Sequence, residues 1–284
     1  MHLVRLSPTG LIPALLMVLL QFPLTARVAA ANYQGTLRIG GTGAALGTIT
    51  QVAAAYQKQH PDVHIVIPPS LGSNGGIKAV LAGALDVGLS SRLPTEAERR
   101  QGAVAWEYAR SPLLLVPAHK GAPVNFSFKE IASLYNGDIK TFPDGAPIRM
   151  VLRPEVEIDM HVVRSMSPEI DAAVTKAQSR EGMLVAVTDQ DNAKILENVR
   201  GAIGWITLAQ IISEKLPVTP FPIENIMPSE ANFVSGKYPY NRLFLVVTGA
   251  QPTPLAKSFI EFLTSAEGRA ILLRNGHFVD VKKP

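Results

Sequence analysis

The 284-residue sequence contains no cysteine, which excludes disulfide bonds, thiolate chemistry and a lipid anchor on an N-terminal cysteine. Charged residues make up only 18% of the chain and form no basic run, so we expect no nucleic-acid partner. The sequence also lacks a G-x-S-x-G motif and any histidine with an evident catalytic partner. We therefore predict that the protein is not an enzyme, and we predict no cofactor.

The first 31 residues have the pattern of a cleaved signal peptide. Arg5 supplies a positive start, Leu11 to Leu20 are almost wholly apolar, and Ala29 to Ala31 offer small side chains for cleavage. The apolar run contains Pro13 and is too short for a bilayer core of about 30 Å. Removing Arg5 and Arg27 with this segment leaves 25 basic against 23 acidic residues, a net charge of +2. We expect a monomer, free in the periplasm.

Short apolar strands alternate with amphipathic helices over the rest of the chain, which predicts an α/β fold with largely parallel sheets. The expected strands are Leu37 to Gly40, Val63 to Ile67, Asp86 to Ser90, Leu113 to Val116, Ile148 to Leu152, Leu184 to Val187, Ala202 to Ile206 and Leu243 to Val247. Helices are predicted from Leu46 to Tyr56 and from Ile77 to Leu85, and a long one from Pro254 to about Asn275.

Two loop-like stretches divide the chain. They are Pro117 to Pro123 and the proline-rich run from Pro217 to Pro239. We expect residues 118–239 to form one lobe, and residues 32–117 and 240–284 to join into the other.

Three short polar turns lie between predicted strands and helices. They are Gly40 to Ala44, which includes Thr42 and Gly43; Gly72 to Gly76, which includes Ser73 and Asn74; and Ser90, Ser91 and Arg92. A helix N-terminus exposes unpaired N–H groups and the positive end of the helix dipole, and glycines let the backbone approach a ligand. Such turns bind anions, and in an open α/β sheet ligands bind outside the carboxyl ends of the strands.

The simpler interpretation of each turn is that Thr42, Ser73 and Asn74 only cap their helices. Nucleotide binding is disfavoured by the sequence. The G-x-G-x-x-G pattern fails at Ala45, and Lys78 is not preceded by a Walker motif.

The order of these turns, together with Gly72-Ser73-Asn74-Gly75-Gly76-Ile77, resembles the phosphate-binding proteins of ABC transporters. Further segments resemble the same family: Ala53 to Lys58, Ile131 to Ile139, Gly201 to Trp205, Tyr238 to Val247 and Ala256 to Gly268. The resemblance runs from about Leu37 to Val279. It implies a type II periplasmic-binding fold, in which two α/β lobes are joined by two crossovers and close on a ligand held in the cleft between them.

The resemblance also implies which residues hold the oxyanion. The first lobe would contribute the backbone of Gly43 and Ala44 with Thr42 nearby, then Ser73 and Asn74, and the turn Ser90, Ser91 and Arg92. The second lobe would contribute Arg153, whose guanidinium fork matches two oxygens of a tetrahedral oxyanion.

Two departures from the family's pattern stand out. Ser91 occupies a position where the family often has an aspartate, and Glu157, Ile158 and Asp159 occupy the positions of a Ser-Gly-Thr turn that grips the anion. An ionised carboxylate is a pure acceptor and repels a bound phosphate. At about 4 Å and an effective dielectric constant near 20, one such pair of charges costs about 4 kcal/mol.

Three interpretations of Glu157 and Asp159 remain open. They are favourable acids at a helix N-terminus; or Asp159 occupies the anion site by pairing with Arg153; or both join His161 on one face of an extended segment that ligates a metal. Because the resemblance implies a helix there, we predict no metal.

The functional prediction is a periplasmic solute-binding protein that captures a small oxyanion, phosphate by default, and delivers it to the permease subunits of an ABC transporter. The alternative is a sensor or interaction module that keeps the two lobes but has lost phosphate affinity or binds another ligand.

Overall fold

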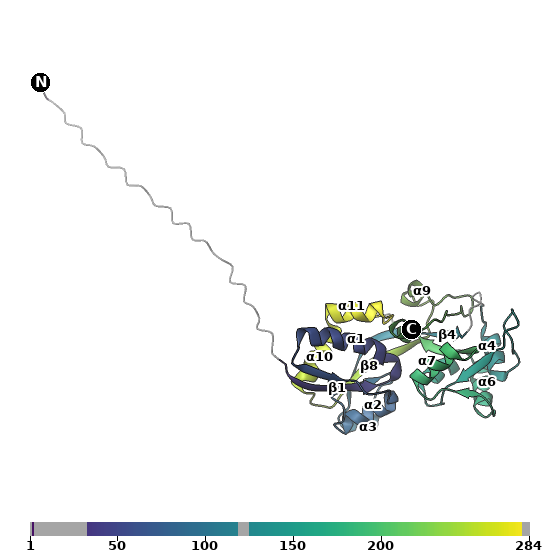
Figure 1. The fold of residues 1–284 in the computed structure, drawn as a ribbon, viewed down its shortest axis with the longest axis horizontal. Helices are drawn as coiled ribbons and strands as arrows, with labels where there is room; N and C mark the ends of the chain where they lie inside the picture. The colour runs from purple at the N-terminus through teal and green to yellow at the C-terminus, as the bar shows by residue number, and fades with distance from the viewer. Residues whose placement is uncertain (1, 3–32, 119–124, 280–284) are drawn as a thin grey trace. The chain divides into compact units, whose positions relative to one another are not determined.

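The computed structural model describes residues 2, 33–118 and 125–279. Apart from residue 2, the predicted signal peptide lies outside the described residues. From Tyr33 onward the chain forms one compact unit (Figure 1). Within residues 33–118 and 125–279, no helix is both long and apolar enough to span a membrane.

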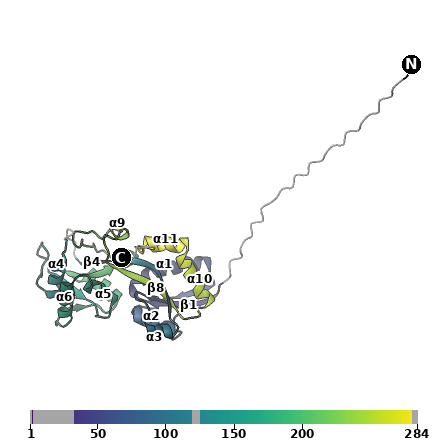
Figure 2. The same ribbon diagram turned by 180° about the vertical axis from the view of Figure 1, so that it is seen from behind.

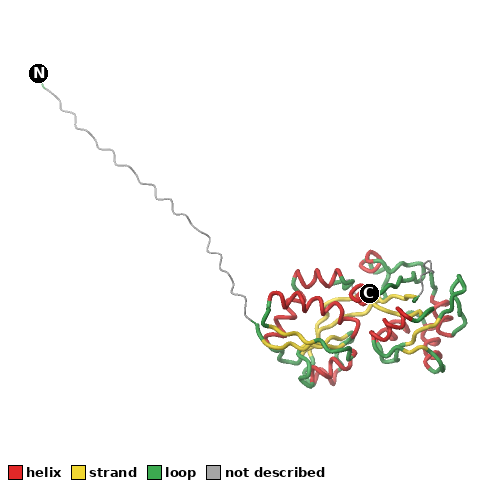
Figure 3. The backbone as a smooth tube through the Cα atoms, in the orientation of Figure 1, coloured by secondary structure: helices red, strands yellow, loops and turns green. Residues whose placement is uncertain are grey.

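The described part of the chain contains an eight-stranded mixed sheet in the order β2-β1-β3-β8-β4-β7-β5-β6. Figure 3 shows the strands in yellow, with the helices around them in red. The strands are β1 (Gly35–Gly41), β2 (Val63–Val66), β3 (Val87–Ser90), β4 (Val104–Pro117), β5 (Arg149–Leu152), β6 (Leu184–Val185), β7 (Ala202–Thr207) and β8 (Asn241–Thr248). Each predicted strand is present. β4 is longer than expected, since it begins at Val104 rather than at Leu113.

The helices are α1 (Gly43–Gln59), α2 (Gly72–Leu81), α3 (Glu96–Arg100), α4 (Phe128–Asn136), α5 (Ile158–Arg164), α6 (Pro168–Gln178), α7 (Asp189–Asn198), α8 (Leu208–Glu214), α9 (Glu230–Val234), α10 (Pro254–Thr264) and α11 (Ala266–Arg274). Figures 1 and 2 show α1, α10 and α11 on one side of β1 and β8, with α2 and α3 on the other.

The prediction of one long C-terminal helix was wrong. Two helices, α10 and α11, meet at Ser265, which leaves the helical conformation with ψ of 170°. The hydroxyl of Ser265 accepts a hydrogen bond from the N–H of Gly268 and so caps α11. The apolar spacing continues through this corner, and for that reason periodicity alone did not show it.

Two hydrophobic cores define two lobes. The first lobe surrounds a core that includes Leu37, Ile49 and Phe259. The second lobe surrounds a core that includes Leu134 and Trp205. The predicted two-lobed α/β fold is therefore confirmed, while the boundaries near residues 117 and 240 stay a prediction.

Strands β4 and β8 connect the lobes. β4 pairs with β8 along residues 104–112 and then with β7 along residues 113–117, so a single 14-residue strand reaches from one core to the other. β8 is paired with β4 along its length, and β4 is paired throughout except at an irregularity between Glu107 and Ala109. Any opening of the lobes must therefore bend a pair of long strands rather than a single loop.

The topology brings the carboxyl ends of strands from both lobes together. β1 and β3 are parallel to each other, and β8 is antiparallel to β3. β4 is antiparallel to both β8 and β7, and β5 and β6 run parallel to β7, so β5 and β6 run opposite to β1 and β3. The carboxyl ends of β1 and β3 in the first lobe therefore face those of β5 and β6 in the second, beside the beginning of β8. Open α/β sheets bind their ligands outside the carboxyl ends of their strands.

Candidate anion-binding site

Helix α1 begins directly after β1 in a tight turn. Gly41 has φ of +146°, and a Cβ atom there would lie 2.0 Å from the carbonyl oxygen of Leu89, so only glycine fits. The N–H of Thr42 donates to that same carbonyl (2.9 Å). This turn fixes the first N–H groups of α1 at the edge of the sheet.

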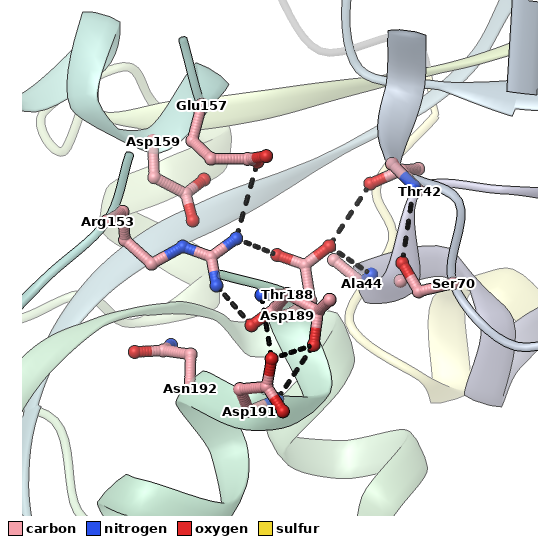
Figure 4. Close-up of polar contacts among 12 residues, drawn as sticks. Thr42, Ala44, Ser70, Arg153, Glu157, Asp159, Thr188, Asp189, Asp191 and Asn192 are labelled. Atoms are coloured by element: carbon pink, nitrogen blue, oxygen red, sulfur yellow. Dashed lines mark hydrogen bonds and ion pairs between the residues drawn. The ribbon is translucent and has the colours of Figure 1, made fainter. Parts of the chain in front are cut away.

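The side chain that meets the N-terminus of α1 is Asp189, not a local cap. Thr42 holds the cap position, but its own side chain does not cap the helix. The N–H of Ala44 and the hydroxyl of Thr42 both donate to Asp189 Oδ2, at 2.9 and 3.3 Å (Figure 4). Asp189 is 145 residues away in sequence, at the first position of α7. A carboxylate from the second lobe thus neutralises a helix terminus of the first lobe.

Two buried arginines hold the other side of this carboxylate. Arg153 Nη2 donates to Asp189 Oδ1 at 3.0 Å and to Glu157 Oε2 at 3.3 Å, while its Nη1 donates to the carbonyl of Thr188. Arg242 Nη1 donates to Asp189 Oδ1 at 3.0 Å and to Asp159 Oδ1 at 3.1 Å. Both guanidiniums belong to side chains only 2% exposed, where such interactions are strong.

Arg242 also reaches the first lobe. Its Nη2 donates to the hydroxyl of Thr42 (2.6 Å), and its Nε donates to the hydroxyl of Ser91 (2.8 Å). We call the four groups that hold the Asp189 carboxylate the anion cradle. They are the Thr42 hydroxyl, the Ala44 N–H, and the guanidiniums of Arg153 and Arg242.

The carboxylates around the cradle differ in their pKa. Burial alone would raise the pKa of Asp189, but the positive charges of Arg242 and Arg153 outweigh it and lower this pKa to about 2. Burial raises the pKa of Asp159, and Arg242 offsets this only in part. Burial likewise raises the pKa of Glu157, against the effect of Arg153. Asp189 is therefore the firmly ionised partner of the two arginines.

The sequence-predicted site residues fall into two groups. Thr42, Ala44 and Arg153 belong to the anion cradle; Ser91, Glu157 and Asp159 contact its arginines; and the carbonyl of Gly43 accepts a hydrogen bond from Gln190. The remaining predicted residues are engaged elsewhere.

Ser73, Asn74, Ser90 and Arg92 form a neighbouring structural network. The Ser73 hydroxyl accepts from the N–H of Ser91 (2.9 Å), which fixes the turn that presents the Ser91 hydroxyl. Arg92 donates to Asn74 Oδ1 at 2.6 Å and pairs with Glu98 at 2.7 and 2.8 Å. Ser90 hydrogen-bonds with the backbone of Arg92. The guanidinium of Arg92 is thus held by Glu98, whose pKa its hydrogen bonds lower to about 2.

A small pocket adjoins the cradle. It has a volume of about 180 Å³ and is lined by Ser70, Leu71, Gly72, Arg153, Glu157, Val187, Thr188 and Asp189. These residues come from both lobes. Arg153 Nε is buried and has no hydrogen-bond partner among the described residues. The site therefore keeps one unused buried donor on the arginine that holds Asp189.

Of the three interpretations of Glu157 and Asp159, the extended metal-binding segment was wrong. Glu157 holds the cap position of α5 and Asp159 lies in its first turn, so both are acids at a helix N-terminus. The described residues contain no group of three or more His, Cys, Asp or Glu side chains that could hold a metal. The second interpretation was also wrong, because Asp159 bonds to Arg242 and not to Arg153, whereas Asp189 bonds to both arginines.

Asp189 and Arg242 were missed at the sequence level. In the run Thr188-Asp189-Gln190-Asp191, the aspartates have the pattern of ordinary first-turn acids, and Thr188 and Asp191 do form a capping box. Arg242 gave the clearer signal, because it is a single cation at the start of the apolar run Leu243 to Val247. A charge in that position is almost never fully buried without a partner.

The fold and this site define a two-lobed binding protein. A family model described as the PBP superfamily domain matches residues 27–267. The chain belongs to that superfamily.

Individual relatives are more distant. The chain is similar to the phosphate-binding protein PstS of Bacillus subtilis, with 25% identity over 87% of this chain and 81% of the relative. PstS of Borreliella burgdorferi is 23% identical over 86% of this chain and 89% of the relative. Among solved structures, a phosphate ABC transporter substrate-binding protein of Clostridium perfringens with bound phosphate is similar in fold. Its TM-score is 0.71 at 23% identity, with 86% of this chain and 99% of that one covered.

Proposed function

We propose that this protein is a periplasmic solute-binding protein that captures a small oxyanion, phosphate by default, for the permease subunits of an ABC transporter. The observation that carries the proposal is the anion cradle. Two neutral donors of the first lobe and two buried guanidiniums converge on the two oxygens of one anionic group. The relatives named for phosphate binding support the choice of anion.

The cradle suits an oxyanion for physical reasons. Helix α1 is 17 residues long and directs its first N–H groups and the positive end of its dipole at the site. The guanidinium of Arg153 is planar and matches two oxygens at once. Because the donors come from both lobes, an anion in the cradle would hold the lobes together. Ligand capture would then be coupled to closure.

Calorimetry of the mature protein at low salt tests this proposal. We expect phosphate to bind, and we expect Arg153→Ala to weaken binding by about 100-fold, since a hydrogen bond to a charged group is worth up to about 3 kcal/mol. Arg149→Ala is the matched control. It removes the same charge from an exposed residue at the start of β5, the strand that leads to Arg153. If phosphate, sulfate and molybdate all give no heat and no thermal shift, the proposed ligand class is wrong.

A second function is favoured by the presence of Asp189 in the cradle. A protein whose anion site is filled by its own side chain can act as a sensor or interaction module without transporting phosphate. Pull-down from envelope extracts separates the two functions. Recovery of permease and ATPase subunits supports transport, whereas recovery of a receptor or another envelope protein without them supports the module.

A further inference from the structure

We propose that Asp189 is an internal stand-in for the oxyanion, and that an external anion enters the cradle only when this carboxylate leaves it. The inference rests on the proposed function, because it concerns the same site. It names the residue that sets how tightly the site binds phosphate.

The contacts of Asp189 are those of a ligand. Its two oxygens accept from an amide at a helix N-terminus, from a hydroxyl and from two guanidiniums, and its side chain is only 5% exposed. A phosphate bound there would need the same donors. The carboxylate and a bound oxyanion therefore cannot occupy the cradle together.

The carboxylate is not needed to begin its own helix. Thr188 caps α7 by accepting from the N–H of Asp191, and the Asp191 carboxylate completes the capping box. Asp189 directs its side chain away from this box toward α1 (Figure 4). The start of α7 therefore stays capped when the Asp189 carboxylate is removed.

Other contacts keep the backbone of Asp189 in place. Gln190 Nε2 donates to the carbonyl of Gly43 at 3.0 Å, and Gln210 Nε2 donates to the carbonyl of Asp189 at 3.1 Å. The approach is close, since a Cβ on Gly43 would lie 2.8 Å from the Cβ of Asp189. Shortening Asp189 to alanine would therefore leave a space bounded by the cradle donors and continuous with the pocket that Asp189 lines.

The charges predict what fills that space. With Asp189 present, two arginines face two aspartates, and burial already disfavours the charge of Asp159. Without Asp189, Arg242 would keep Asp159 and Arg153 would keep Glu157, and burial disfavours the charge of both of these carboxylates. A free anion would then gain the interactions that Asp189 makes now.

Asp189→Ala tests the proposal, with Glu197→Gln as the control. Glu197 is an exposed residue of the same helix, so its substitution changes the net charge equally without touching the cradle. We expect Asp189→Ala to lower Tm by roughly 5–15 °C, because it leaves buried charge uncompensated. Millimolar phosphate or acetate should restore much of this loss. Phosphate affinity should rise about 100-fold over the wild type, the effect of removing one buried like charge.

Asp189→Asn separates charge from shape. The amide fills the same space without a negative charge, so phosphate should restore its Tm much less than that of Asp189→Ala. If Asp189→Ala responds to phosphate and acetate no more than the wild type and Glu197→Gln do, the proposal is overturned.

Two results distinguish this proposal from the proposed function. Tight phosphate binding by the wild type that Asp189→Ala abolishes would make Asp189 part of the ligand site; the inference would fail and the function would stand. Restoration of Asp189→Ala by acetate, without binding of any tested oxyanion to either protein, would support the internal anion and reject phosphate capture.

Discussion

The two lobes meet at the cradle with different chemistry. The first lobe contributes neutral groups, namely the hydroxyls of Thr42 and Ser91 and the N–H of Ala44. The second lobe contributes charged groups, namely Arg153, Asp189 and, next to them, Asp159 and Glu157. Arg242 comes from β8, one of the two strands that connect the lobes.

This difference explains how the site can hold either a ligand or a side chain. Neutral donors at a helix N-terminus stabilise any anion that reaches them, whether it is free or covalently attached. The charges of the second lobe decide which anion that is. In the present structure it is a carboxylate of the second lobe itself, so the first lobe is satisfied without a solute.

The largest expected effect follows from removing Arg242, whose guanidinium contacts residues of both lobes. Arg242→Ala would leave Asp159 and Asp189 buried with only Arg153, and it would remove the donors to Thr42 and Ser91. Breaking a buried ion pair by removing one partner costs about 3–5 kcal/mol in the free energy of unfolding. Chemical denaturation measures this cost.

Arg149→Ala, an exposed change of equal charge, should cost less than about 0.5 kcal/mol. A cost for Arg242→Ala as small as that of the control would show that the lobes are not held together through this arginine.

Much of the first lobe's part of the site could be predicted from sequence, and the reason is local. A glycine-rich turn between a strand and a helix places N–H groups at the sheet edge whatever the rest of the chain does. Thr42 and Ala44 are therefore recognisable from neighbouring residues alone. The eight strands follow from equally local runs of apolar residues.

The second lobe's part could not be predicted in the same way. Asp189 reaches Ala44 across 145 residues, and Arg242 reaches Thr42 across 200. No local pattern distinguishes Asp189 from Asp191 two residues later, yet the first is buried among arginines and the second is exposed. Which acid meets which arginine depends on how the two lobes pack.

A second prediction compares the two buried aspartates of the second lobe. The pKa of Asp189 is lowered to about 2, so its stabilising contribution is present above its unfolded pKa of about 4 and is lost as pH falls toward 2. Asp189→Asn should therefore cost roughly 2–3 kcal/mol at pH 7 and little at pH 2. The test is to measure the free energy of unfolding of both proteins at a series of pH values from about 2 to about 7, and to compare how it changes with pH.

Asp159 should behave in the opposite way. Because burial raises its pKa, its ionised form is disfavoured in the folded state, and the stability that its neutral form provides is lost as pH rises. Since the raised pKa means that the charge of Asp159 adds little net stability, Asp159→Asn should cost less than about 1 kcal/mol at pH 7. Equal costs for the two substitutions would contradict the assignment of Asp189 as the main counter-ion.

The smallest expected effect concerns Glu157, at the rim of the same cluster. Burial raises its pKa, so stability from its neutral form is present below its unfolded pKa of about 4.3 and is lost as pH rises through the folded pKa. Gln cannot ionise, so Glu157→Gln avoids the stability that is lost when Glu157 becomes charged. It should stabilise the protein by about 0.5–1 kcal/mol at pH 7 and give no gain at about pH 3, where Glu157 is already neutral. The shift in Tm with pH gives the measurement.

Glu155→Gln, two residues earlier and mostly exposed in its pair with Arg164, serves as the matched control and should change stability by less than about 0.5 kcal/mol. A clear destabilisation by Glu157→Gln would instead mean that its contact with Arg153 outweighs the cost of burial. In that case both carboxylates that contact Arg153 would stabilise the second lobe, and removing Asp189 would leave Arg153 with a stabilising partner.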